Sequence, residues 1–318
     1  MDKIRHTLCP ILAAFIWGTA FVYQDMGSEY LGAFSFNFAR SVVATVFLFV
    51  LSIAVDLFTI SRQKKAGTYE PLSKEEHQKE VKTTLLAGLI CGTVLAVPAV
   101  LQQQGIAMSG AAKSGFLTAL YVVLVPVAGM FLKKKVPLRV WVAVVISVAG
   151  LYFICIQPGT DMSVSAGDWF LLACALMFTI QILTIDHFSA RIDGIKLSCL
   201  QFAVVSLETG IGTLLFEDTH VADYRAALIP ILFCGLLSSG VAYTLQIISQ
   251  KGANPTIVSI LMSLESVFAT LAAAMILHQI LTGREYLGCV LMFIAVLLAQ
   301  VPVELLLKKR DPKEEGAE

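Results

Sequence analysis

Residues 31–55 read LGAFSFNFARSVVATVFLFVLSIAV, a predominantly apolar run in which Arg40 is the only charged side chain. The hydrocarbon core of a bilayer is about 30 Å thick, so a helix needs roughly 20 apolar residues to cross it. A run of this length and composition predicts a transmembrane helix.

The rest of the chain has the same character. Of its 318 residues, 57% are hydrophobic and 14% are charged, against roughly 25% charged residues in a soluble domain. Nine further apolar runs of membrane-spanning length lie at Leu8–Gln24, Thr83–Leu101, Ser114–Leu132, Val140–Ile156, Trp169–Ile185, Leu197–Phe216, Ala226–Ser249, Thr256–Leu277 and Tyr286–Val303. The sequence therefore predicts an all-α integral membrane protein with ten transmembrane helices.

The first run follows Lys3 and Arg5, as the apolar segment of a signal peptide would. It ends in Tyr23-Gln24-Asp25, however, and not in the small residues typical of a cleavage site. We therefore expect this run to remain in the protein as its first helix.

The basic residues predict the orientation, because cytoplasmic loops of membrane proteins are rich in lysine and arginine. With the N-terminus inside, 19 of the 23 basic residues fall on the cytoplasmic side. These are Lys3, Arg5, Arg62, Lys64, Lys65, Lys74, Lys79, Lys82, Lys133, Lys134, Lys135, Arg139, Arg191, Lys196, Lys251, Lys308, Lys309, Arg310 and Lys313. Lys113, Arg225 and Arg284 fall outside. We expect a multi-pass protein of the cell membrane with both termini in the cytoplasm.

The two halves of the chain repeat each other. The aligned segments are Trp17–Phe21 with Met177–Gln181, Cys91-Gly92 with Cys234-Gly235, Leu120–Pro126 with Ile260–Ser266, and Trp141 with Tyr286. Between the first and second pairs the offset falls, because the expected cytoplasmic linker 58–82 is longer than its counterpart, Glu217 to Arg225.

Each half has five crossings, so the second half enters the membrane from the opposite side. The sequence thus predicts two inverted five-helix repeats, an architecture typical of secondary transporters. We assign residues 1–157 to the first repeat, 158–307 to the second, and 308–318 to a cytoplasmic tail.

Four segments carry a resemblance to a known family. They are Ala13–Phe21 (AAFIWGTAF), Phe38-Ala-Arg40, Ser114–Pro126 (SGFLTALYVVLVP) and Met262-Ser-Leu-Glu265. In this order, and in two halves, they resemble the EamA branch of the drug/metabolite transporter superfamily. Ser266 and Gln279 stand where that family often has proline and glutamate. The resemblance implies ten helices, transport of a small metabolite or drug, and a central cavity with the fifth and tenth helices as scaffold.

Three charged residues lie within the apolar runs: Arg40, Glu208 and Glu265. At 1.5 Å per residue, each is about 13 to 17 Å from the nearer start of its helix, close to the bilayer midplane. A charge at that depth costs roughly 2.5 to 3.5 kcal/mol even on the lenient insertion scale, so such residues are functional candidates. The three charges predict a shared substrate-binding or coupling site. The alternative is that Arg40 and a glutamate form a structural ion pair.

Neutral polar residues on the same helices complete the predicted site. Asn37 shares a helix face with Arg40 at a spacing of three residues. The other candidates are Trp17, Gln24, Gln103 and Gln246, for which packing or hydrogen bonding between helices is the alternative.

Other chemistry has little support in the sequence. A net charge of zero gives no indication of nucleic acid binding, and the seven cysteines show no paired spacing. The histidines are scattered, and no phosphate loop or hydrolase motif is found. We expect no enzyme activity, no metal and no cofactor.

The sequence therefore predicts a secondary transporter that moves a small solute through the lipid bilayer by alternating access. One arginine and two acids suit a zwitterion such as an amino acid, and protons are a candidate coupling ion. A lipid-headgroup flippase, a channel-like pore and a membrane scaffold remain alternatives. The sequence is compatible with both a monomer and a homodimer.

Overall fold

The computed structural model describes residues 2–69, 73–133, 136–156, 159, 165–276 and 280–300. Within these ranges every regular element is a helix. The elements are α1 (Asp2–Ser28), α2 (Ala33–Ala66), α3 (Lys74–Ser109), α4 (Ala111–Ala119), α5 (Tyr121–Phe131), α6 (Leu138–Cys155), α7 (Ala166–Ser189), α8 (Gly194–Phe216), α9 (Val221–Ala226), α10 (Leu228–Phe233), the π-helix η1 (Cys234–Ala242), α11 (Tyr243–Gln250), α12 (Pro255–Met262), α13 (Glu265–Ile276) and α14 (Gly283–Gln300).

These helices form ten membrane spans by length and composition. Seven spans are single helices. The fourth joins α4 to α5, the eighth joins α10, η1 and α11, and the ninth joins α12 to α13. The prediction of an all-α protein with ten transmembrane helices is confirmed.

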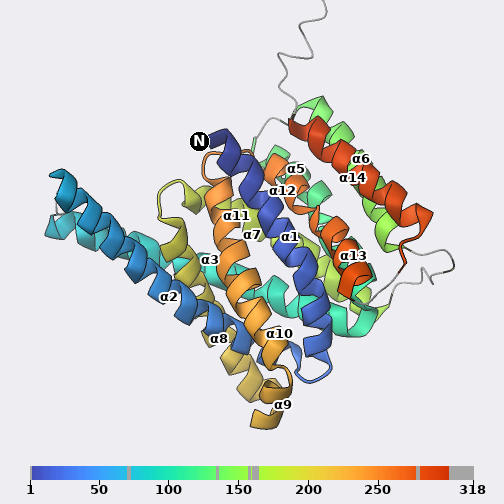
Figure 1. The fold of residues 1–318 in the computed structure, drawn as a ribbon, viewed down its shortest axis with the longest axis horizontal. Coiled ribbons are helices and arrows are strands. Elements are labelled where there is room, and N and C mark those ends of the chain that lie inside the picture. The colour runs from blue at the N-terminus through green and yellow to red at the C-terminus, as the bar shows by residue number, and fades with distance from the viewer. Residues whose placement is uncertain are drawn as a thin grey trace, which may run out of the picture.

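The expected linker 58–82 is for the most part helical and not a loop. No glycine or proline interrupts residues 57–66, so α2 continues to Ala66 and ends at Gly67, whose φ of 68° only glycine adopts without strain. A capping box of Ser73 and Glu76 then starts α3. The end of α2 and the start of α3 project together beyond the other helices (Figure 1).

Two equivalent glycine contacts join the halves. A Cβ on Gly92 in α3 would lie 2.5 Å from Cβ of Val204 in α8, and one on Gly235 in η1 would lie 2.7 Å from Cβ of Val43 in α2. Gly92 and Gly235 are aligned in the repeat. The third helix of each half thus packs on the second helix of the other, as inverted repeats require.

Polar contacts show which helix ends share a face of the molecule. At one face, Arg5 donates to the Lys251 carbonyl (3.1 Å) and Thr7 to the Gln300 side chain (3.2 Å). Lys196 pairs with Asp56 (3.2 Å) between the start of α8 and the end of α2. All these segments belong to the side predicted to be cytoplasmic.

The pair α6 and α14 lies at one edge of the bundle (Figure 1). Gly150 and Gly288 bring the two backbones together, since a Cβ on Gly288 would lie 2.7 Å from the Gly150 carbonyl oxygen. The fifth and tenth spans therefore pack on each other, outside the helices that surround the interior.

Several expectations fall on residues outside the described ranges. They concern Lys134 and Lys135, most of the junction between the repeats, Gln279, the end of the tenth run and the tail 308–318. The repeat boundaries therefore stay a prediction.

Candidate functional site

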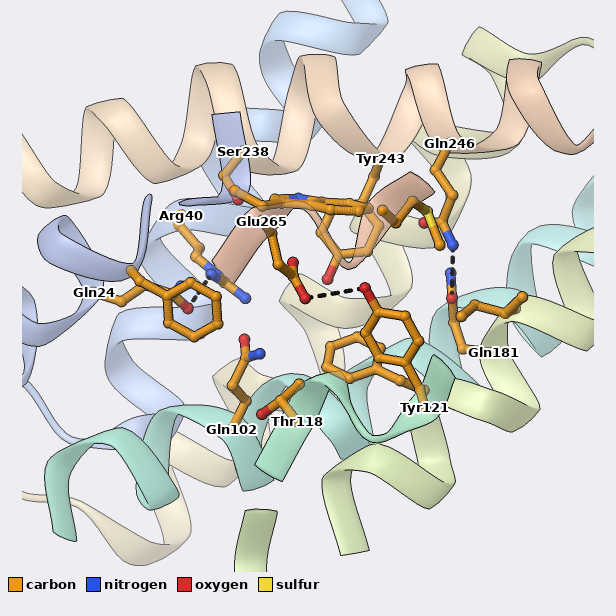
Figure 2. Close-up of a pocket in the computed structure, with 15 residues that line it drawn as sticks. Gln24, Arg40, Gln102, Thr118, Tyr121, Gln181, Ser238, Tyr243, Gln246 and Glu265 are labelled. Atoms are coloured by element: carbon orange, nitrogen blue, oxygen red, sulfur yellow. Dashed lines mark hydrogen bonds between the residues drawn. The ribbon is translucent and has the colours of Figure 1, made fainter. Parts of the chain in front are cut away.

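A pocket lies in the interior of the bundle and is lined from both halves of the chain (Figure 2). Its residues come from α1, α2, α3, α4, α5, α7, η1, α11, α12 and α13. They are Trp17, Phe21, Gln24, Arg40, Gln102, Thr118, Tyr121, Phe178, Gln181, Ile182, Ser238, Tyr243, Gln246, Met262 and Glu265. The α6–α14 pair contributes none of them, in keeping with a scaffold position.

Arg40 occupies one end of this pocket (Figure 2). It is 3% exposed, and its Nη1 donates to Oε1 of Gln24 at 3.0 Å. Within the described part of the chain, no carboxylate forms an ion pair with Arg40, and its Nε has no hydrogen-bond partner. A buried cation without an opposite charge is costly, so this end of the pocket is suited to an anionic group.

Glu265 faces the middle of the pocket (Figure 2). It is 6% exposed and accepts a hydrogen bond from the Tyr121 hydroxyl at 3.0 Å. The turn Ser263-Leu264 interrupts the ninth span immediately before it, so Glu265 is the first residue of α13. This local break places the acid at the start of a new helical segment inside the span.

A pair of amides occupies the end away from Arg40 (Figure 2). Gln246 Nε2 donates to Gln181 Oε1 at 3.1 Å, and each side chain is 1% exposed. Aromatic residues cover the pocket nearby, because Trp17 packs edge-on against Tyr243 with ring centroids 4.9 Å apart. The pocket is therefore a row of polar groups between apolar walls.

Three interrupted spans supply much of this row. Tyr121 follows the break between α4 and α5, and Glu265 follows the break between α12 and α13. Ser238 lies in η1, and Tyr243 is the first residue after it. Discontinuous membrane helices often form the binding sites of transporters, and π-helical segments are frequent at functional sites.

Five of the eight residues proposed from the sequence line the pocket: Trp17, Gln24, Arg40, Gln246 and Glu265. Arg40 and Glu265 are brought to one pocket but do not form the ion pair considered as the alternative, since no such pair joins these two described residues.

The other three proposed residues lie elsewhere. Glu208 is on α8, which lines no part of the pocket, and accepts from Thr93 Oγ1 at 2.6 Å. Of the three charges expected to share one site, the pocket therefore brings together Arg40 and Glu265, while Glu208 lies outside it. Asn37 donates to the Ala99 carbonyl (3.1 Å), and Gln103 donates to the Gln24 carbonyl (2.9 Å), so both join helices behind the pocket.

Sequence reasoning missed several lining residues: Gln102, Thr118, Tyr121, Gln181, Ser238 and Tyr243. Two signals were available for some of them. Tyr121 lies within the segment Ser114–Pro126, and Gln181 closes the repeated segment that aligns with Trp17–Phe21. The position of each side chain relative to the pocket depends on the helix breaks, which the apolar pattern does not reveal.

Comparison with known proteins agrees with the fold. The model of the EamA-like transporter family matches residues 6–156 and again residues 165–300. An uncharacterized transporter of Archaeoglobus fulgidus is 26% identical over 294 residues, which cover 92% of this chain and 84% of that protein. A solved crystal structure matches with a TM-score of 0.74 at 14% identity, covering 95% of this chain and 98% of the other, a likeness that shows the fold alone.

The resemblance read from four short segments of the sequence is thus confirmed over both halves of the protein. The chain is a multi-pass membrane protein that belongs to the EamA-like transporter family.

Proposed function

We propose that this protein is a secondary transporter that carries a small zwitterionic metabolite, such as an amino acid, by alternating access, with Glu265 exchanging the coupling proton. Membership in a family of transporters gives the general activity. The substrate, the coupling and the mechanism are inferred from the pocket.

The observation that carries the proposal is that two buried charges line one pocket without forming an ion pair with each other. Among the described residues, Arg40 has no acid partner, and Glu265 accepts a hydrogen bond from a neutral hydroxyl, that of Tyr121. A solute carboxylate would compensate Arg40, and a solute ammonium would compensate Glu265. A zwitterion satisfies both charges at once, whereas a simple anion or cation leaves one of them unpaired.

The size of the pocket favours a carrier over an open pore. Its cavity volume is about 40 Å³, enough for roughly three water molecules at about 15 Å³ each. An amino acid is larger than this, so the helices around the pocket must separate to admit it. The interrupted spans at Tyr121 and Glu265 supply places where such a movement can occur.

Proton coupling follows from the position of Glu265. The protonation of a buried carboxylate depends on its solvation and on its hydrogen bonds. At Glu265 both change when the pocket opens to water or fills with substrate. We propose that a proton binds in one facing state and leaves in the other.

The orientation proposed from the basic residues places both termini in the cytoplasm and the protein in the cell membrane. The face that carries Arg5, Lys196 and Lys251 is then the inner one. One chain supplies the whole pocket from its two halves, so a homodimer, if formed, would hold two separate sites.

Counterflow in proteoliposomes tests the proposal. Vesicles loaded with unlabelled amino acids should take up the matching labelled amino acid transiently, with a rate that saturates. Flux that does not saturate would indicate a pore, and movement of a fluorescent phospholipid between leaflets would indicate a flippase. No flux of either kind would favour a membrane scaffold.

A further inference from the structure

The Gln181–Gln246 pair is a polar feature of the pocket that the two charges do not explain. It lies at the end opposite Arg40, with Glu265 between the two ends (Figure 2). Both side chains line the pocket and both are 1% exposed. Burying a primary amide is costly unless its hydrogen bonds are made.

Only one of the hydrogen bonds that these amides can make is formed between them. Gln246 Nε2 donates to Gln181 Oε1, while Gln246 Oε1 and Gln181 Nε2 have no hydrogen-bond partner. Exchanging oxygen and nitrogen in both amides reverses the bond but again leaves one acceptor and one donor free. The surplus of one donor and one acceptor therefore does not depend on how the amides are oriented.

A primary carboxamide offers the complementary set, because its oxygen accepts and its NH₂ donates. A carboxylate offers only acceptors, and Arg40, the one cation among the lining residues, is at the far end. A thioether or an alkyl group would leave both surplus atoms buried and unpaired. The end of the pocket at Gln181 and Gln246 is thus suited to a neutral group that carries both a donor and an acceptor.

We propose that Gln181 and Gln246 form a subsite for the side-chain carboxamide of the transported amino acid, so that the carrier selects glutamine-like over acidic and apolar substrates. This inference rests on the proposed function, in which Arg40 binds the α-carboxylate and Glu265 the α-ammonium. Gln181 and Gln246 then bind the third polar group of the same solute, its side-chain carboxamide.

The discrimination should be measurable. Leaving a buried polar group unsatisfied costs about 1–3 kcal/mol, which is roughly 5- to 150-fold in affinity at 1.4 kcal/mol per factor of ten. L-Glutamine should therefore compete in counterflow at least about fivefold better than L-glutamate, which has nearly the same shape, or L-methionine, which has a similar length.

The experiment compares these three amino acids in proteoliposomes of the unaltered protein and of two variants. Gln246→Met removes the free acceptor and the bond to Gln181, so it should abolish the preference for glutamine over methionine, measured as the ratio of their competition in counterflow. Gln250→Met is the matched control: Gln250 lies one turn further along α11, is fully buried, donates to the Ile182 carbonyl (2.9 Å) and does not line the pocket. It should keep the preference.

The outcomes separate this inference from the proposed function. Saturable counterflow with no preference for glutamine in the unaltered protein would overturn the subsite and leave the proposed function standing, and this result does not depend on either variant folding. Equal loss of the preference in Gln250→Met would also overturn it. Absence of saturable counterflow with every amino acid would overturn both.

Discussion

Arg40, in the first half of the chain, and Glu265, in the second, each form a hydrogen bond with a neutral partner. Gln24 accepts from Arg40, and Tyr121 donates to Glu265, so neither charge neutralises the other. A direct ion pair would be stabilised by its own attraction and would give a solute less to bind. Neutral partners orient each side chain yet leave its charge available.

Replacing Arg40 tests the anionic end of the pocket. Arg40→Lys keeps the charge but loses the planar fork that binds a carboxylate with two hydrogen bonds. Loss of one charge-assisted hydrogen bond costs about 1.5–3 kcal/mol, so substrate half-saturation in counterflow should rise about 10- to 150-fold. Membrane insertion, measured by detergent extraction and size-exclusion profile, should be unchanged. If Arg40→Leu transported substrate at the wild-type rate, the substrate-binding site would have to lie elsewhere in the protein.

Replacing Glu265 tests proton coupling. Glu265→Gln imitates the protonated acid permanently and also removes the charge that would compensate the substrate ammonium. It should therefore exchange substrate only with a raised half-saturation, and it should lose accumulation driven by an imposed pH difference. Glu208→Gln is the control, because Glu208 lies outside the pocket, and it should keep that accumulation. If Glu265→Gln still concentrated substrate against its gradient, Glu265 would have no part in coupling.

The two charges in the pocket could be predicted from the sequence because charged residues are rare within apolar runs. Glu208 met the same criterion, yet it lies on α8 beside Thr93 and away from the pocket. Depth along a helix can be counted from the sequence, but the direction in which a side chain points cannot be without the packing. Gln102 and Gln181 were missed for a related reason: amides are frequent at contacts between membrane helices, so their presence alone indicates little.

At the scale of elements, α1 and α13 approach each other closely beside the pocket. A Cβ on Gly18 would lie 2.5 Å from the Glu265 carbonyl oxygen and 2.6 Å from the Ala269 nitrogen. Both neighbours are backbone atoms, which cannot rotate away as a side chain can. The absence of a side chain at Gly18 therefore sets the distance between the first span and the start of the interrupted helix that carries Glu265.

Gly18→Ala should accordingly separate α1 from α13. Overpacking of this kind costs about 1–3 kcal/mol, and the melting temperature of the purified protein should fall. Gly115→Ala in α4 is the matched control, because a Cβ there meets no atom within 4 Å. Equal melting temperatures for the two variants would mean that the close approach at Gly18 is not required for stability.

At the scale of the whole molecule, the ten crossings and the family could be predicted from hydrophobic runs and short motifs, since the bilayer itself imposes their length. The interruptions within the membrane spans could not be predicted in this way. The turn at Ser263-Leu264 and the π-helix η1 lie inside apolar segments without a proline at the point of change. The chain between Leu57 and Lys82 was expected to be a loop because it is hydrophilic, but polar residues continue a helix as readily as apolar ones.

Cysteine labelling tests the proposed orientation. A cysteine at Lys65 should react with a membrane-impermeant reagent only after the cells are permeabilised, whereas one at Asp218 should react in intact cells. The unaltered protein supplies the background, because its seven cysteines are buried or half-buried. Labelling at Lys65 in intact cells would reverse the orientation.

The equivalent contacts of Gly92 with Val204 and of Gly235 with Val43 carry a genetic consequence. The surface between the halves contains the same contact twice, as a dimer of two separate polypeptides would, and none of these four residues lies in the segment that connects the halves. A gene cut in two, encoding residues 1–156 and 165–318, should therefore complement itself: a tag on one fragment should copurify the other and restore counterflow. Fragments that never associate would show that the covalent connection is itself needed for assembly.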